Sequence, residues 1–498
     1  MILNIKGDVN RYYVQSLCML FFPGSTFGEG ETSAQGIPEV DVEVYKNVVG
    51  DDVAIVSIKL NDKVCSNTCV VAADEDISVA THSAIAVGRA LFAAGKELLS
   101  HTPPWGILTG VRPAKIAGDI INLGNGILKT KKILRDEYLL NPQKAALAVS
   151  VANTENKLLK KLGRNTCSLY ISIPFCPTRC SYCSFVSYTT PRLLSLIDDY
   201  IDALLTDIDE TIDTIRMLNM NITTVYIGGG TPTTLDESQL ERLLSHIASR
   251  VDIASLAEFS LEAGRPDTIT EKKLQIAKKY GVSRISVNPQ TLNDEILKEI
   301  GRRHTTEDFY NAYQLSIKSG IPNVNVDLIA GLPGDDFKNF SETIDKIIDL
   351  SPTNITVHTF CVKKAADALK NNSSIYSLTG MDVTKSISYS QLKTKFAGYK
   401  PYYMYRQKNT VGNYENVGFA LEGHEGLYNI YMMEELHSIF SAGAGAVTKL
   451  VDNTGNDVSG KSIERLFNQK YPYEYLREDR SEDFRAAALK FYSEHSLI

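Results

Sequence analysis

Short runs of β-branched residues alternate with helically periodic segments through the middle of this chain. The runs cover 169–173, 223–227, 258–262, 283–288, 325–329 and 355–360. The helical segments between them cover 194–217, 237–249, 267–280, 293–301, 306–319 and 338–349. The alternation predicts a parallel sheet, because each helix returns the chain to begin the next strand in the same direction. Six such units predict an α/β fold with a partial (β/α)6 barrel, since a complete eightfold barrel takes about 250 residues.

Two further regions flank the predicted barrel, which we place at 165–375. Residues 1–160 are expected to form an N-terminal α+β domain, and residues 376–498, where the alternation stops, a smaller C-terminal α+β domain. The N-terminal elements that we expect are strands at 42–49 and 53–60 and helices at 77–99, 129–138 and 142–161.

Composition excludes several classes of protein. Hydrophobic residues make up 43% of the 498 residues and charged residues 22%, as in folded globular chains. The net charge of −7 provides no basic excess for nucleic acid. No apolar run approaches the roughly 18 residues of a membrane span, and the N-terminus lacks a signal-peptide pattern. We therefore expect a cytoplasmic protein with no membrane or nucleic-acid partner. We also expect a monomer, since no heptad pattern indicates a coiled coil.

Cys176, Cys180 and Cys183 form a CxxxCxxC motif directly after the first predicted barrel strand. Active sites of such barrels gather at the carboxyl ends of the strands. In a reducing compartment, clustered cysteines bind metal or do redox chemistry more often than they form disulfides. A 4Fe–4S cluster held by three thiolates leaves one iron open to another ligand. The alternative is a structural zinc site, which needs a fourth ligand from a distant residue.

Glycine and polar residues follow the later predicted strands. Gly228-Gly229-Gly230-Thr231 ends the second strand, and glycines let a ligand approach the backbone closely. The candidates at the following strand ends are Glu262, Gln290, Arg302, Asp327 and His358. Carboxylates suit ribose hydroxyls or an amino group, and an arginine suits a carboxylate. A shared ligand therefore explains this set better than unrelated caps and ion pairs do.

Residues 105–113 hold the single tryptophan of the chain, Trp105, together with glycines and prolines. The interpretation we favour is a structured loop whose tryptophan packs on a neighbouring domain. The alternative is a loop that closes over a ligand, with Arg112 facing an anion.

These motifs resemble those of the radical S-adenosylmethionine (SAM) enzymes, for which CxxxCxxC with a following aromatic residue and a GGG segment are typical. Residues 170–176, 228–233, 301–305 and 327–334 resemble more narrowly the oxygen-independent coproporphyrinogen III oxidase (coproporphyrinogen dehydrogenase) group. Residues 105–113 and 405–409 resemble its HemZ-type branch, which carries its own N-terminal domain.

The resemblance implies a radical SAM barrel and a role for each matching residue. Cys176, Cys180 and Cys183 would hold a 4Fe–4S cluster, whose open iron SAM would chelate. Tyr170 and Phe185 would flank the cluster and the adenine. The other SAM-binding residues would be Gly229, Gly230, Thr231, Glu262, Gln290, Arg302 and Asp327, with Asp327 a candidate for the ribose. Tyr170 and Arg302 would also be catalytic.

The resemblance also implies a reaction and partners. An electron from the cluster would cleave SAM to methionine and a 5′-deoxyadenosyl radical, which would take a hydrogen atom from a propionate of the tetrapyrrole substrate. Loss of carbon dioxide and one further electron would leave a vinyl group. Two such events would convert coproporphyrinogen III to protoporphyrinogen IX in anaerobic haem biosynthesis. Flavodoxin or ferredoxin would donate electrons. The candidates for binding propionates are Arg112, Arg406 and Lys408, and further Lys363 and Lys364.

The chain departs from the pattern of the group. Ser172 stands where the group usually has histidine, and Ser184 follows the last cysteine of the motif. No fourth cysteine lies two positions after Cys183, which argues against the second SAM of the best-known members. The segment Asn413-Tyr414-Glu415-Asn416 replaces an expected His-Tyr-Glu, so we expect substrate recognition to differ.

Two other functions fit the same residues. A haem-binding chaperone of the same group would use an axial iron ligand, for which His358, His424 and His437 are candidates. A third hypothesis is a radical SAM enzyme that methylates or opens haem. The N-terminal domain of the HemZ-type branch favours the oxidase.

Overall fold

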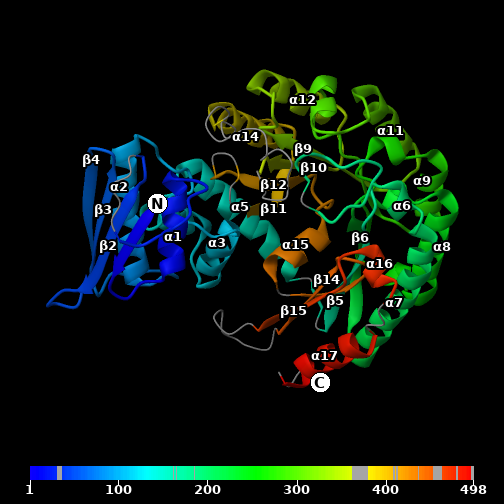
Figure 1. The fold of residues 1–498 in the computed structure, drawn as a ribbon, viewed down its shortest axis with the longest axis horizontal. Helices are drawn as coiled ribbons and strands as arrows, with labels where there is room; N and C mark the ends of the chain where they lie inside the picture. Colours follow the sequence, from blue (N-terminus) through cyan, green and yellow to red (C-terminus); the bar gives the residue numbers. More distant parts are fainter. Residues whose placement is uncertain are drawn as a thin grey trace. The chain divides into compact units, whose positions relative to one another are not determined.

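Two units make up the chain, which is described here by a computed structural model (Figure 1). Unit 1 contains Met1–Asn156 and Met404–Glu415, and unit 2 contains Lys157–Tyr403 and Asn416–Ile498. The structure describes all residues except 31–35, 161, 164, 184, 362–379, 408–409, 411–412, 436, 453–461, 478–480 and 495–498.

Unit 1 is built on a four-stranded sheet with helices against it. The strands, in spatial order, are β1 (Ile2–Lys6), β2 (Glu39–Lys46), β3 (Asp52–Leu60) and β4 (Lys63–Val71). Strand β1 pairs parallel with β2, and the other pairs are antiparallel. The helices are α1 (Arg11–Phe21), α2 (His82–Leu99), α3 (Pro113–Asn122), α4 (Ile127–Asp136) and α5 (Pro142–Leu159). Helix α2 packs on β3 and β4 because it carries a continuous apolar face, which is buried.

Residues 404–415 complete unit 1 although they lie far along the chain from its other residues. The indole Nε1 of Trp105 donates to Glu415 Oε2 at 2.7 Å, and Lys144 Nζ pairs with Glu415 Oε1. Glu415 is fully buried and Lys144 almost so. The tryptophan therefore packs within its own unit, against a segment that we expected to belong to a C-terminal domain.

The sheet of unit 2 has eleven strands in the order β11-β12-β10-β9-β8-β7-β6-β5-β13-β14-β15. Its central strands, all parallel, are β5 (Thr166–Ile173), β6 (Asn221–Gly229), β7 (Glu258–Leu261), β8 (Arg284–Ser286), β9 (Asn323–Ala330) and β10 (Asn354–Thr359). These are the six predicted strands in their predicted sequence, so the partial (β/α)6 barrel is confirmed.

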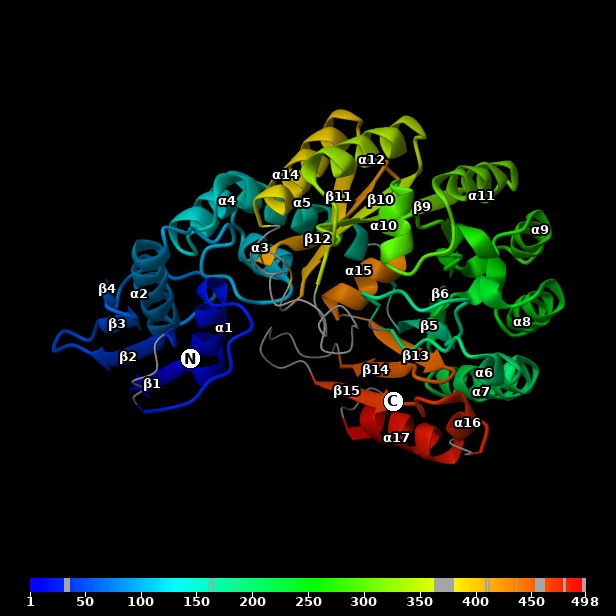
Figure 2. The same ribbon diagram turned by 45° about the horizontal axis from the view of Figure 1, so that its top comes forward.

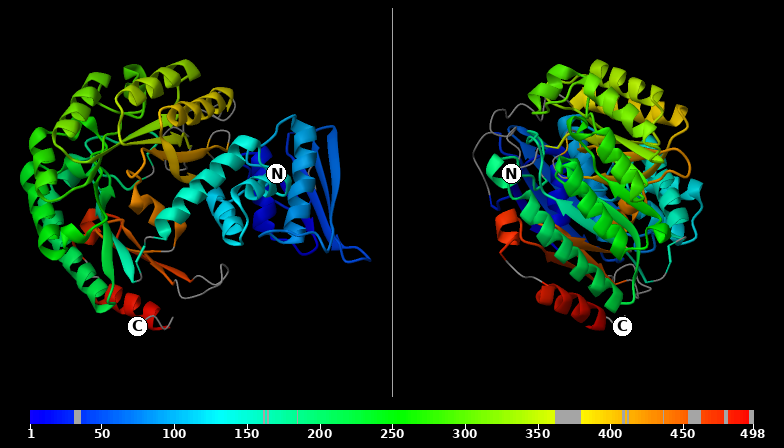
Figure 3. Two further views of the ribbon diagram at one scale, coloured as in Figure 1. Left: turned by 180° about the vertical axis from the view of Figure 1, so that it is seen from behind. Right: turned by 90° about the vertical axis from the view of Figure 1, so that its right-hand side faces the viewer.

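Helices cover the outer face of this parallel sheet (Figures 1 and 3). They are α6 (Pro191–Leu194), α7 (Ile197–Met217), α8 (Glu237–Arg250), α9 (Glu271–Lys279), α10 (Asp294–Glu299), α11 (Thr306–Lys318), α12 (Phe337–Asp349) and α14 (Gly380–Phe396). Three short 3₁₀ helices lie at Pro232–Thr234, Ile253–Ser255 and Pro266–Thr268. Among the helices of the described ranges, none is long and apolar enough to cross a membrane.

The region 376–498 does not form the separate third domain that we expected. Its strands β11 (Lys400–Arg406), β12 (Glu415–Ala420), β13 (Ser438–Ala442), β14 (Val447–Val451) and β15 (Ile463–Phe467) extend the barrel sheet at both edges. Strand β12 pairs antiparallel with β10, and β13 pairs parallel with β5. The region therefore shares its backbone hydrogen bonds with the barrel.

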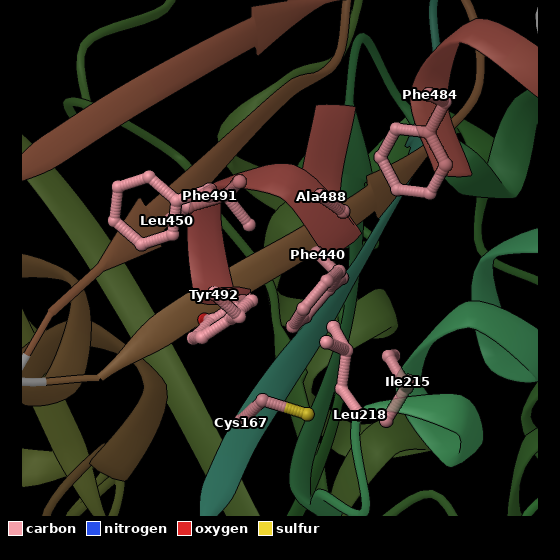
Figure 4. Close-up of a cluster of buried hydrophobic side chains, with 9 residues drawn as sticks. All are labelled: Cys167, Ile215, Leu218, Phe440, Leu450, Phe484, Ala488, Phe491 and Tyr492. Carbon is pink, nitrogen blue, oxygen red and sulfur yellow. The ribbon is translucent and has the colours of Figure 1, made fainter. Parts of the chain in front are cut away.

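The last helices of this region also pack on barrel elements. Helices α16 (Pro472–Tyr475) and α17 (Ser481–Glu494) follow β15. Figure 4 shows a buried cluster in which side chains of α17 meet β5, α7, β13 and β14. The cluster contains Cys167, Ile215, Leu218, Phe440, Leu450, Phe484, Ala488, Phe491 and Tyr492. One hydrophobic core thus joins the barrel to the C-terminal helix.

Helix α15 (Leu427–Glu434) lies against the inner face of the parallel strands (Figure 2). A buried carboxylate, Glu258 of β7, holds its first turn by accepting from the backbone N–H groups of Leu427 (2.9 Å) and Tyr428 (3.3 Å). The same carboxylate pairs with Arg284 at 3.1 Å. Anions stabilise a helix N-terminus, so Glu258 both fixes α15 and neutralises Arg284.

We predict that Glu258→Ala lowers the free energy of unfolding by about 3–5 kcal/mol, because it leaves the buried Arg284 unpaired. Denaturant unfolding of the full chain measures the loss. The double variant Glu258→Met with Arg284→Met should lose less than the single variant, because it leaves no buried unpaired charge. A loss below about 1 kcal/mol for Glu258→Ala would contradict the role of this carboxylate.

Candidate functional site

The cysteine motif occupies the loop that follows β5, at the carboxyl edge of the parallel strands. Backbone hydrogen bonds anchor it on both sides: Cys176 N–H donates to Tyr188 O (3.1 Å) and Ser181 N–H donates to Ile300 O (3.0 Å). The hydroxyl of Thr178 donates to Gly301 O at 3.0 Å. The loop is therefore pinned to the end of α10, which brings Arg302 beside it.

The three thiols lie in a largely buried environment with arginine side chains nearby. Cys176 and Cys180 are each 8% exposed. Thr231 Oγ1 lies 3.2 Å from Cys176 Sγ, and Arg265 Nη1 lies 3.6 Å from Cys180 Sγ. Burial raises the pKa of Cys176 to about 11 and also raises the pKa of Cys183. These thiols favour the neutral form until positive charge reaches them, and metal ions supply such charge.

The donor set fits an iron–sulfur cluster better than a single zinc ion. Three thiolates can each bind a different iron of a 4Fe–4S cluster, which leaves the fourth iron open to another ligand. The predicted zinc alternative needs convergent ligands and a fourth donor.

The glycine segment at the end of β6 packs directly on the cysteine loop. Gly230 N–H donates to Ile173 O and Thr231 N–H to Phe175 O, both at 2.7 Å. A Cβ on Gly230 would come within 2.5 Å of Phe175 O. Gly229 has φ +105°, which favours glycine. The segment is therefore required for this close approach, and its predicted contact with the SAM amino group remains a prediction.

Two carboxylates with different protonation lie on the same edge. Burial, with the charge of Asp327, raises the pKa of Glu262 to about 7. Tyr226 donates its phenol hydrogen to Glu262 Oε1, and Ser286 Oγ donates to the same oxygen at 2.8 Å. Burial works to raise the pKa of Asp327, but His358 and Asn325 hold it below its usual value.

The polar contacts of Asp327 confirm that His358 faces this site. His358 Nε2 lies 3.7 Å from Asp327 Oδ2, and Asn325 Nδ2 donates to Asp327 Oδ1 at 2.7 Å. Near neutrality Glu262 is thus partly protonated whereas Asp327 is ionised. The pair offers one hydrogen-bond donor and one acceptor to a ligand.

Gln290 presents an unsatisfied polar atom at the same edge. Its Oε1 is buried without a hydrogen-bond partner among the described residues. The backbone of Gln290 has φ +70° and forms two hydrogen bonds with β9. Gln290 N–H donates to Asp327 O (3.1 Å), and Gln290 O accepts from Ile329 N–H (3.0 Å). A buried carbonyl without a donor is costly, so this atom fits a ligand N–H or O–H.

The side chain of Arg302 forms hydrogen bonds that hold the cysteine loop in place. Its guanidinium donates to Asn288 O (2.7 Å), Gly264 O (3.1 Å) and the Tyr182 hydroxyl (3.1 Å). Tyr182 lies between the second and third cysteines of the motif. Arg302 therefore orients the loop from within, and its predicted catalytic and SAM-binding roles remain predictions.

Tyr170 lies in a stack of three phenol rings on the inner face of the strands. Its ring centroid is 6.1 Å from that of Tyr226 and 6.3 Å from that of Tyr428, and the latter two are 4.3 Å apart. Burial raises the pKa of Tyr170 to about 12, so the phenol stays neutral. The stack lies beside Glu262, to which the Tyr226 phenol is hydrogen-bonded.

Among the remaining predicted residues, Phe185 contacts Cys183 through its backbone. Phe185 is 68% exposed. Arg112 and Arg406 belong to unit 1, and Arg406 is buried there. Lys408, Lys363 and Lys364, together with Ser184, lie outside the described residues.

Tyr182, Arg265 and Tyr226 also lie at the site, although the sequence motifs predict no role for them. Tyr182 was visible as the aromatic residue inside the cysteine motif, and Arg265 as a cation three positions after Glu262. Tyr182 meets Arg302, Tyr226 meets Glu262 and Arg265 meets Cys180, all far away in the sequence, so no local pattern reveals these contacts. The pairing of Arg265 with Asp267, in contrast, is local.

Comparisons with known proteins agree with this geometry. The family model of the radical SAM superfamily matches residues 170–347. An oxygen-independent coproporphyrinogen-III oxidase-like protein HemZ of Bacillus subtilis is 37% identical over 394 residues, which cover 78% of this chain and 77% of the relative. A haem chaperone HemW of the same organism is 36% identical over 39% of this chain and 51% of its own length.

A solved structure of coproporphyrinogen III oxidase HemN from Escherichia coli aligns with a TM-score of 0.46 and 21% identity, over 57% of this chain and 64% of that one. Radical SAM proteins use a 4Fe–4S cluster and SAM, and Cys176, Cys180 and Cys183 are positioned to hold that cluster. From the extent of its similarity to HemZ, the chain belongs to the oxygen-independent coproporphyrinogen-III oxidase-like family of the radical SAM superfamily.

Proposed function

We propose that this protein oxidatively decarboxylates propionate side chains of coproporphyrinogen III to vinyl groups, giving protoporphyrinogen IX. The observation that carries the proposal is one edge of the parallel sheet, which bears the three cysteines together with Glu262, Asp327 and the unsatisfied Gln290. The family supports the tetrapyrrole substrate. Each reaction removes one hydrogen atom and carbon dioxide, and passes one further electron to an acceptor. We expect flavodoxin or ferredoxin as the electron donor.

The residues of the edge would hold SAM in a dry, polar setting. When bound, the cluster supplies the electron that cleaves SAM to methionine and a 5′-deoxyadenosyl radical. Asp327, ionised beside His358, would accept hydrogen bonds from the ribose hydroxyls. Gln290 would accept from a SAM donor through Oε1, and Glu262 would hold its proton toward the ligand. Tyr170 and Tyr428 would shield the site from water.

A haem-binding chaperone is the second candidate, because haem chaperones HemW are among the relatives. It needs an axial iron ligand. His424 Nδ1 is hydrogen-bonded to Asn323 at 2.7 Å, His437 is buried and stacks on Tyr431, and His358 contacts Asp327. A metal-ligating histidine usually keeps its other ring nitrogen hydrogen-bonded, so His424, whose Nδ1 is held by Asn323, would present Nε2 to the iron.

The test is incubation of the anaerobically reconstituted protein with SAM, a reductant and coproporphyrinogen III, followed by mass analysis. We expect 5′-deoxyadenosine to form in step with loss of one or two carbon dioxides. Cys180→Ala should lose both activities and most of the bound iron, whereas Cys69→Ala, in unit 1, should keep them. SAM cleavage with an intact tetrapyrrole would reject the oxidase, and haem titration would then test the chaperone.

Gln290→Met should weaken SAM binding without weakening the fold. The variant keeps the shape of the side chain but removes the unsatisfied Oε1. We expect the dissociation constant for SAM to rise about threefold to tenfold, the range for one lost hydrogen bond. The thermal midpoint of the SAM-free protein should stay equal or rise. Gln275→Met, on α9, is the matched control, and unchanged SAM affinity in Gln290→Met would contradict the assignment.

Glu262→Gln should change how stability depends on pH. A folded pKa of about 7 lies above the unfolded value of about 4.3, so the folded state retains a proton that the unfolded chain releases. The wild type therefore loses stability as the pH rises between these values, and the glutamine variant lacks that loss. Thermal unfolding across this range measures the difference, with the surface variant Glu342→Gln as control. Parallel profiles for wild type and Glu262→Gln would contradict the raised pKa.

A further inference from the structure

Unit 1 contains a small cavity beside the buried Arg406. Its volume is about 40 Å³, and it is lined by residues of α1, by the loop after Trp105 and by Arg406, Gln407 and Asn413. The polar lining comes from Ser16, Thr109, Gln407 and Asn413. A cavity of this size holds about three water molecules, which is also the space of one carboxylate group.

Arg406 carries a positive charge that its surroundings do not neutralise directly. Lys144 pairs with Glu415, the one carboxylate of this buried cluster. Among the described residues no carboxylate lies within 4 Å of the Arg406 guanidinium, which donates to Leu108 O and lies 5.7 Å from the Trp105 ring centroid. Burial lowers the pKa of Arg406 to about 10 even though Glu415 acts to raise it. A buried cation without a direct counter-charge is costly, and a bound anion would offset that cost.

The described residues of the lining provide no carboxylate to meet this need. They are Ser16, Met19, Leu20, Pro23, Thr109, Val111, Arg406, Gln407 and Asn413. Arg406 is the one charged residue among them, so the described lining carries a positive charge.

The lining also selects among anions. Leu20, Pro23 and Val111 give one side of the cavity an apolar surface, whereas Thr109, Gln407 and Asn413 give the other side hydrogen-bonding groups. The planar fork of a guanidinium matches a carboxylate. We propose that this cavity binds the carboxylate of a short-chain carboxylic acid, with the alkyl carbons against Leu20 and Val111. The group is either a free acid or a propionate arm of a tetrapyrrole, and the proposal does not rest on radical chemistry.

The single tryptophan of the chain gives a direct measurement, because Trp105 lies against Arg406. Sodium propionate is titrated into the full-length protein at constant ionic strength, and tryptophan fluorescence is followed. We expect a saturable change with propionate and none with sodium chloride. An equal response to chloride, or tighter binding of inorganic phosphate than of propionate, would overturn the proposal.

Variants separate binding from folding. Arg406→Met should abolish the saturable response, and Arg406→Lys should raise the dissociation constant about tenfold, because lysine cannot hold both oxygens. Leu20→Phe should block the cavity while it keeps the charge. Arg135→Met, on the exposed side of α4, is the matched control, and circular dichroism verifies the fold of each variant. A wild-type response in both Arg406→Lys and Leu20→Phe would overturn the proposal even if Arg406→Met fails to fold.

A competition arm distinguishes the two sources of the carboxylate. Displacement of propionate by coproporphyrin III would support a tetrapyrrole arm as the occupant. Propionate binding that coproporphyrin III leaves unchanged would support a free short-chain acid. Because this titration needs neither SAM nor reductant, its result is independent of the decarboxylation assay.

Discussion

The parallel direction of β5 to β10 is the constraint on which the site depends. All six strands end at one edge, so residues separated by long stretches of sequence are brought together there. Arg265 after β7 contacts Cys180 after β5, and Arg302 after α10 donates to Tyr182 of the same cysteine loop. An antiparallel arrangement would divide the same residues between two edges. The chemistry of these side chains therefore depends first on the topology of the sheet, which brings them together.

Away from that edge, buried carboxylates fix the positions of neighbouring elements. Glu258 neutralises Arg284 and holds the start of α15, which in turn places Tyr428 against Tyr226. In unit 1, Glu415 receives both Trp105 and Lys144. Each of these carboxylates has several partners and so restricts the arrangement of its neighbours more than a hydrophobic contact would.

The sequence predicted the barrel well because its buried parallel strands are continuous β-branched runs. It failed for β1, β4, α1 and α3; β4, for instance, has the polar sequence KVCSNTCVV and is mostly exposed. The third domain was expected because alternation stops near residue 376, yet the pairing of β13 with β5 is long-range and leaves no local periodicity. Likewise, Arg302 was placed at the site from the sequence, but its bond to Tyr182 depends on the fold.

The position of Glu415 has a consequence for synthesis of the protein. On the ribosome, Trp105 and Lys144 emerge well before their carboxylate partner, with the whole parallel sheet in between. Domains generally fold in order from the N-terminus as they emerge. Here the buried pair of Lys144 and Glu415 can form only after all six parallel strands have been made. Unit 1 therefore acquires the last part of its buried polar core late in synthesis, although most of its residues are made first.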